Sequence, residues 1–212
     1  IAQFKINNLH VLNYSIPVDK KVSYEELKQH IHTLPHMPEI IPYVTSYYNE
    51  RWGFCLSQIE FDSLPKEGEY HVFIDSSLEH GHLSYGECVL KGESEEEILF
   101  STYLCHPSMA INELSGPLAQ AFLYKELARI ENRKYTYRFV FAPETIGVIA
   151  FLDKMGQHLK SNLKAGYVLT CLGHEGKLTY KRTKLENCDT DRIAEHVLDS
   201  LGLEKDVREF SI

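Results

Sequence analysis

Histidine and glutamate side chains stand where apolar stretches of the sequence end. His106 follows the apolar residues 98–104, and Glu113 lies in the segment after it, just ahead of a helix-like pattern. Glu144 takes the same place after the apolar residues 135–141. Imidazole nitrogens and carboxylate oxygens are ordinary zinc ligands. This arrangement therefore favours a metal site in which His106 and Glu113 contribute donors.

A third apolar stretch ends in the same way. Residues 165–172 run into Gly173, His174 and Glu175. If the three stretches are strands of one α/β sheet, their carboxyl ends are the place where such sheets bind ligands. We therefore interpret the three ends as one candidate site and include His174 among its candidate metal ligands.

Each of these residues also has a simpler interpretation. His106 fits a loop histidine that hydrogen-bonds to the backbone, and Glu113 fits an acidic residue that favours a helix amino terminus. His174 precedes Gly176 and fits a polar turn. Glu144 is harder to explain in this way, because a carboxylate between an apolar strand and an apolar helix is costly to desolvate unless a charge meets it.

The spacing of apolar residues predicts the elements that position these side chains. The stretches 98–104, 135–141 and 165–172 are rich in strand formers, and helical spacing follows near Ser115, Thr145 and Asp189. Ser115 suits an N-cap. This alternation predicts an α/β fold from about Glu95 onward, with a mixed, mainly parallel sheet flanked by helices.

The first half of the chain does not continue this alternation. Residues 69–75 and 83–90 read as strands around a turn, and Ser23 opens a capping box at the start of a short helix. We predict two domains: residues 1–93 as a β-rich domain with short helices that contains Trp52, and residues 94–212 as the α/β domain. The charged connection 92–97 marks the boundary.

Composition narrows the classes of function. The chain has 212 residues, 43% hydrophobic content and a net charge of −8, which argues against nucleic acid and anionic membrane as partners. The five cysteines form no Cys-x-x-Cys pair, and this favours reduced thiols and a cytoplasmic location. The start at Ile1 and the strand-like residues 207–212 indicate an internal, incomplete piece of a longer protein.

Several short sequence motifs occur in the same order as in a bacterial aminopeptidase-like family of unassigned function, and the chain resembles that family. The family is itself similar to the co-catalytic zinc exopeptidases. The resemblance covers almost the whole chain and implies a mixed sheet flanked by helices, with a smaller β-rich domain inserted. It implies His106 as a zinc ligand and Glu144 as the general base. The motifs are Asn8-Leu9-His10, Tyr14-Ser15-Ile16-Pro17, Arg51-Trp52-Gly53, Cys105-His106-Pro107-Ser108, Leu114-Ser115-Gly116-Pro117 and Pro143-Glu144-Thr145-Ile146-Gly147.

The chain departs from that family at two ligand positions. Asn112 stands where the resemblance implies a bridging aspartate, and an amide is a weaker zinc ligand than a carboxylate. Either Glu113 takes over by a shift of one residue, or the second metal is lost. Thr145 stands where a ligand glutamate is implied, and the closing histidine of the family would lie beyond Ile212. We expect one or two zinc ions in the intact protein, and weak or absent binding in this fragment.

The function that follows is a zinc-dependent aminopeptidase-like hydrolase that cleaves an amide bond in a peptide or an amino-sugar conjugate. The alternative is a non-catalytic binding module on the same fold that has lost metal ligands. Asn112 and Thr145 favour the module, whereas His106 and Glu144 favour the enzyme. A shared site requires the side chains of His106 and Glu144 to lie within roughly 10 Å of each other.

Overall fold

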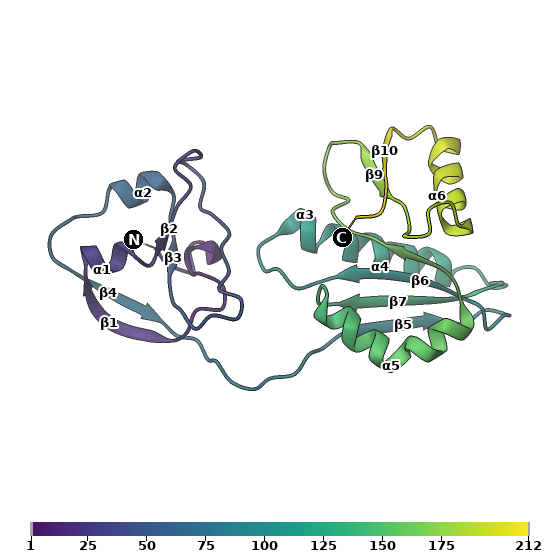
Figure 1. Ribbon diagram of the computed structural model, residues 1–212, viewed down its shortest axis with the longest axis horizontal. Coiled ribbons are helices and arrows are strands. Elements are labelled where there is room, and N and C mark those ends of the chain that lie inside the picture. The colour runs from purple at the N-terminus through teal and green to yellow at the C-terminus, as the bar shows by residue number, and fades with distance from the viewer. Residues whose placement is uncertain (1, 212) are drawn as a thin grey trace. The chain divides into compact units, whose positions relative to one another are not determined.

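The computed structural model describes residues 2–211, and its chain divides into two units between Gly81 and His82 (Figure 1). This division precedes the boundary that we expected near Glu93. The reason is strand β5 (Gly86–Leu90), which pairs antiparallel with β7 (Thr136–Ala142) of the second unit. A strand that belongs to a sheet by long-range pairing gives no local signal of that membership.

The first unit is built on two short pairs of strands. Strand β1 (Val18–Ser23) pairs antiparallel with β4 (Glu69–Ile74), and β2 (Ile31–His32) pairs parallel with β3 (Phe54–Cys55). The helices of this unit are η1 (Asn8–His10), α1 (Tyr24–Lys28) and α2 (Gln58–Asp62). As predicted, the Ser23 hydroxyl caps α1 by accepting the Glu26 N–H. Buried apolar side chains form the core: Val22, Leu27, Trp52, Leu56, Leu64, Val72 and Ile74.

The second unit contains a four-stranded sheet in the order β5-β7-β6-β8, which confirms the predicted α/β class. Strand β6 (Glu97–Tyr103) lies between β7 and β8 (Leu163–Val168), and it is parallel to both. Only the edge strand β5 runs antiparallel. The carboxyl ends of the three parallel strands therefore lie at one edge, as the sequence pattern required.

Helices cover both faces of this sheet (Figure 1). Val140 and Ala142 of β7 pack with Phe151 and Leu159 of α5 (Ile146–Asn162). Phe139 points to the other face, because its ring meets that of Tyr124 in α4 (Ser115–Ala128) edge to face. This alternation is expected of a strand with both faces buried.

The remaining elements follow β8. Strands β9 (Leu178–Lys181) and β10 (Lys205–Arg208) pair parallel, and α6 (Asp189–Ser200) connects them in sequence. Gly202, at φ +63°, adopts the left-handed conformation expected just after the end of α6. Within the described residues, no helix has the length and apolar character needed to span a membrane, and all five cysteines are free thiols.

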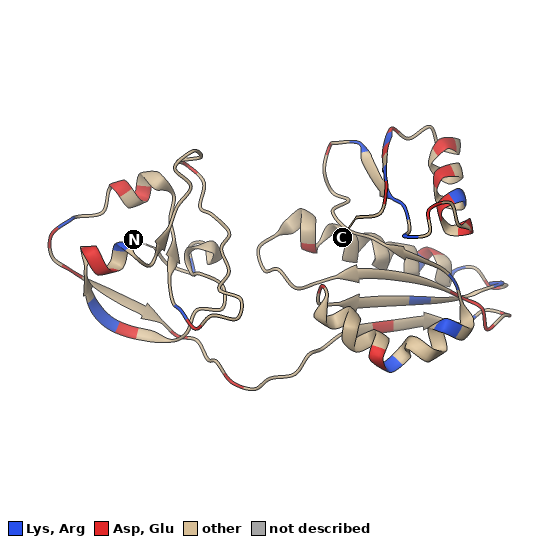
Figure 2. Ribbon diagram, in the orientation of Figure 1, with Lys and Arg blue, Asp and Glu red and all other residues tan. Residues whose placement is uncertain are grey.

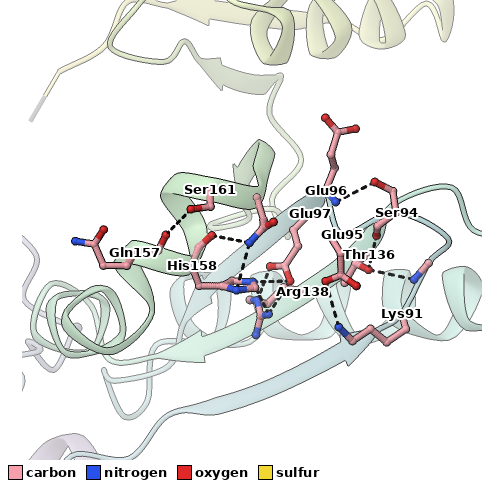
Figure 3. Close-up of polar contacts among 12 residues, drawn as sticks. Lys91, Ser94, Glu95, Glu96, Glu97, Thr136, Arg138, Gln157, His158 and Ser161 are labelled. Atoms are coloured by element: carbon pink, nitrogen blue, oxygen red, sulfur yellow. Dashed lines mark hydrogen bonds and ion pairs between the residues drawn. The ribbon is translucent and has the colours of Figure 1, made fainter.

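A buried ion-pair network holds the amino ends of β6 and β7 (Figure 3). Glu97, only 1% exposed, receives two hydrogen bonds of 2.7 Å from the Arg138 guanidinium, and it lies 2.9 Å from Nε2 of His158 in α5. Glu87 of β5 contacts the same guanidinium. Burial favours the neutral acid, but the hydrogen bonds from Arg138 and His158 outweigh it and hold the pKa of Glu97 below its usual value.

Candidate functional site

The loop after β6 and the short helix α3 (Ala110–Glu113) bring His106 and Glu113 together. Nδ1 of His106 lies 2.8 Å from Oε1 of Glu113. The other carboxylate oxygen of Glu113 accepts the backbone N–H of Cys105. Glu113 is only 4% exposed, so this carboxylate is removed from water and held by the turn that it faces. Both oxygens thereby fix the orientation of the imidazole ring.

Glu144 approaches the opposite nitrogen of the same ring. It follows β7, and its Oε2 lies 3.9 Å from Nε2 of His106. The predicted proximity of these two side chains is therefore confirmed. The Glu144 side chain is 53% exposed, in contrast to that of Glu113, so it can meet a molecule from solvent. His106 stands between one buried and one accessible carboxylate.

The backbone around Glu144 leaves little freedom. Thr145 has φ 59°, a left-handed conformation that is costly for a β-branched residue. Gly147 permits this turn, because a Cβ at that position would lie 2.6 Å from Cδ of Pro143 and 2.9 Å from Cβ of Ala142. Ser108 and Cys171, in the loops after β6 and β8, also have positive φ. Strained residues of this kind persist where the surrounding structure holds them, often at functional sites.

Cys105 joins the site, although the sequence pattern did not single it out. Its Sγ lies 3.1 Å from Nδ1 of His106 and accepts the backbone N–H of Glu144 at 3.2 Å. Burial raises the pKa of this thiol, the Glu144 N–H opposes that effect, and the carboxylates of Glu113 and Glu144 add to it. The only sequence signal was its position next to His106 at a strand end.

The donors converge closely enough to hold one ion. One atom each from Cys105, His106 and Glu113 lie within 4.8 Å of one another. The side-chain oxygen of Asn112 is buried and accepts no hydrogen bond from the described residues. His174 is exposed and lies outside the group, and its Nδ1 accepts the N–H of Gly176 at 2.8 Å, as in the polar turn that the sequence also allowed.

A pocket of about 420 Å³ opens at the site, lined by residues 104–110 together with Glu113 and Leu114. None of the lining residues is Lys or Arg, and Figure 2 shows acidic but no basic residues along this loop and α3. Among the described residues, no Lys or Arg forms an ion pair with Glu113 or Glu144. Leu104 and Leu114 remain about half exposed and form an apolar wall.

Ser115 has a different role from the N-cap that we predicted. It is the first residue of α4, and Leu114 occupies the N-cap position without a side-chain hydrogen bond. The Ser115 hydroxyl instead accepts the N–H of Leu172 at 2.8 Å. It therefore ties the start of α4 to the loop after β8, so that the loops after two parallel strands share one support.

Comparison with known proteins gives matches over nearly the whole chain. A family model described as "Domain of unknown function (DUF4910)" matches residues 7–212. A Clostridium acetobutylicum protein named "Putative polysaccharide biosynthesis protein with aminopeptidase-like domain" is 50% identical over 210 residues, which are 99% of this chain and 48% of that protein. A crystal structure of a "putative peptidase" from the same species matches with a TM-score of 0.94 at 50% identity, over 98% of this chain and 49% of that one. The chain spans about half the length of these relatives.

Proposed function

The chain belongs to the DUF4910 family, and from that premise we propose that it carries the hydrolytic site of a zinc-dependent, aminopeptidase-like enzyme. The substrate that we propose is an amide bond in a peptide or an amino-sugar conjugate. The name of the clostridial relative, which joins polysaccharide biosynthesis to an aminopeptidase-like domain, supports this class of substrate. The clostridial structure, described as a "putative peptidase", supports the reaction type.

One observation carries the metal part of this proposal. His106 lies between two carboxylates, one of them buried, and no Lys or Arg among the described residues balances their charge. A buried carboxylate without a cation is unfavourable. A divalent cation bound by His106 and Glu113 would remove that cost, and nitrogen and carboxylate donors suit zinc.

The side chains divide the chemical work. A zinc ion held by His106 and Glu113 would supply Lewis-acid chemistry: it would polarise the scissile carbonyl and lower the pKa of a bound water to about 7. Glu144, accessible and next to the ring of His106, accepts the proton of the attacking water and returns it to the leaving amine. Glu113 would hold the ion together with His106 through Oε1, while its other oxygen stays fixed by the backbone N–H of Cys105. The apolar wall of Leu104 and Leu114 contacts the substrate and excludes water.

This chain offers few zinc ligands, and we therefore expect its affinity for zinc to be low. Asn112 and Thr145 occupy positions where the resemblance implied carboxylates, and a catalytic zinc uses about three protein ligands. We therefore propose weak binding of a single ion by these 212 residues. His174 and Asn112 stay candidates for further ligands, and His174 would have to leave its turn with Gly176 to join the group.

Calorimetry of zinc binding tests this proposal. We expect weak binding by the unaltered chain, no binding by His106→Ala, and unchanged binding by His82→Ala, which removes an exposed histidine of the same unit. In the intact protein, Glu144→Gln should lower kcat for amide hydrolysis by about 10²–10⁴-fold, the usual contribution of a general base, and leave zinc bound. Binding of an amino-sugar peptide without zinc and without turnover would favour the non-catalytic module instead.

A further inference from the structure

We propose that the Cys105 thiolate is the third protein ligand of this site. The metal would then be held by Sγ of Cys105, Nδ1 of His106 and Oε1 of Glu113. This inference rests on the proposed function, because it assumes that the pocket binds a metal ion. It adds a donor that neither the sequence pattern nor the resemblance indicated, and it predicts which metals the site prefers.

The donor geometry already approaches that of a metal site. Sγ of Cys105 and Nδ1 of His106 are 3.1 Å apart, and Nδ1 is 2.8 Å from Oε1 of Glu113. A tetrahedral zinc with bonds of roughly 2.3 Å to sulfur and 2.0–2.1 Å to nitrogen or oxygen holds its donors about 3.4–3.6 Å apart. These two pairs of donors need to separate by less than about 1 Å to admit the ion, and all three donors lie within 4.8 Å of one another.

The backbone supports both anionic donors of this set. The N–H of Glu144 points at Sγ of Cys105, and hydrogen bonds from backbone N–H groups stabilise a thiolate. The N–H of Cys105 binds the outer oxygen of Glu113, so the remaining oxygen faces the imidazole ring. These supporting bonds come from fixed main-chain groups at the ends of β6 and β7, and they orient ligands as outer partners do in metalloproteins.

Charge and donor type then select the metal. A thiolate beside Glu113 adds a second negative charge to a pocket whose lining has no Lys or Arg, and only a cation makes that arrangement favourable. Sulfur with imidazole nitrogen suits zinc, cobalt or cadmium, whereas magnesium and calcium prefer oxygen donors throughout. The site should therefore reject the hard cations.

A competing position for the ion lies on the other side of the ring. Nε2 of His106 and Oε2 of Glu144 are 3.9 Å apart, which is too long for a hydrogen bond but short enough for one ion to bridge them. Among the described His, Cys, Asp and Glu side chains, no group of three or more gathers on that side, and the Glu144 side chain there is 53% exposed. The Nδ1 side offers three donors, one of them buried, and for this reason we assign the ion to it.

Cobalt(II) titration of the 212-residue chain distinguishes the two positions. We expect a thiolate-to-cobalt charge-transfer band in the near ultraviolet, present in the unaltered chain and in Cys88→Ser, and absent in Cys105→Ser. Cys88 is an exposed thiol on β5 and serves as the matched control. We expect Cys105→Ser to weaken cobalt binding by more than the 10–100-fold loss typical of outer-sphere substitutions.

Alkylation of the unaltered chain provides a second measurement that does not depend on folding of a variant. Zinc should slow the reaction of Cys105 with iodoacetamide and leave that of Cys88 unchanged, and magnesium should protect neither thiol. Cobalt binding without the charge-transfer band, together with equal alkylation rates, would overturn the role of Cys105 while the proposed metal site survives. A folded chain that binds neither cobalt nor zinc would overturn both proposals.

Discussion

The two ends of the β6–β7 pair carry the same kind of cluster with opposite outcomes. At the amino end, His158, Glu87 and Glu97 surround Arg138, and both carboxylates contact its guanidinium. Figure 3 shows Glu97 and His158 beside Arg138. At the carboxyl end, His106 and two glutamates surround no Lys or Arg among the described residues. The Arg138 guanidinium is the difference between the two clusters, the closed network at the amino end and the open cluster at the other, and its counterpart at the carboxyl end is the cation that we propose.

The two clusters differ in whether the fold stabilises the charged form of a buried group. Arg138 holds the pKa of Glu97 down despite burial, so folding itself stabilises the charged form. Around Cys105, burial and neighbouring carboxylates raise the pKa of the thiol, so the fold by itself favours the protonated form. A cation bound beside this thiol would favour the thiolate, and a ligand that binds only the folded state would stabilise that state.

We expect the largest loss of stability from a substitution that breaks the ion-pair network of Arg138. Arg138→Met should lower the free energy of unfolding by about 3–5 kcal/mol, because it leaves Glu97 buried without its cation. Urea unfolding at neutral pH measures the loss. Arg129→Ala, which removes an exposed ion pair with Glu126, should cost at most about 1 kcal/mol. Equal losses in the two variants would contradict the role that we give to burial.

Zinc should stabilise the open cluster and leave the closed one unaffected. At a free zinc concentration of 100 times Kd, the free energy of unfolding should rise by about 2.7 kcal/mol. A thermal unfolding series with increasing zinc detects this as a rising Tm. The rise should disappear in His106→Ala and persist in His158→Ala. A rise of similar size in both variants would place the ion elsewhere.

A matched pair of isosteric substitutions compares the two buried carboxylates directly. Without metal, Glu97→Gln should lower the free energy of unfolding by about 1–3 kcal/mol, since it breaks charged hydrogen bonds to Arg138 and His158. Glu113→Gln should change it by less than about 1 kcal/mol, because no guanidinium loses a partner. Chemical unfolding of both variants checks the difference. A greater cost at Glu113 would mean that its ring contact alone stabilises the loop.

The smallest effect is the pH dependence that Glu97 of the closed network adds to the stability of the chain. The pKa of Glu97 is lower in the folded chain than its ordinary value of 4.5, so the unfolded state takes up the proton first. The stability that Glu97 contributes is therefore fully present above about pH 4.5 and is lost as the pH falls toward the folded pKa. Unfolding measured between neutral and acidic pH should show a steeper loss for the unaltered chain than for Glu97→Gln. Parallel curves would rule out Glu97 as the titrating group.

The sequence by itself determined which strands and helices position the site residues. Apolar strand patterns alternating with helical spacing placed His106 and Glu144 after two neighbouring parallel strands, and their proximity followed from that topology. The N-cap at Ser23 was readable for the same reason, since its hydrogen bond with the Glu26 N–H joins residues close in sequence, although the reciprocal bond of the predicted capping box is not formed. Signals of this kind are local, and the chain needs no other segment to produce them.

Only the tertiary structure decided the contacts between distant segments. The pairing of β5 with β7 moved the domain boundary, and Ser115 bonded to the loop after β8 instead of capping its own helix. Cys105 became a candidate ligand because the ring of His106 and the N–H of Glu144 both reach its sulfur. Arg138 neutralised one cluster and left the other open. The properties of these side chains depend on what long-range packing places beside them, and no local pattern contains that information.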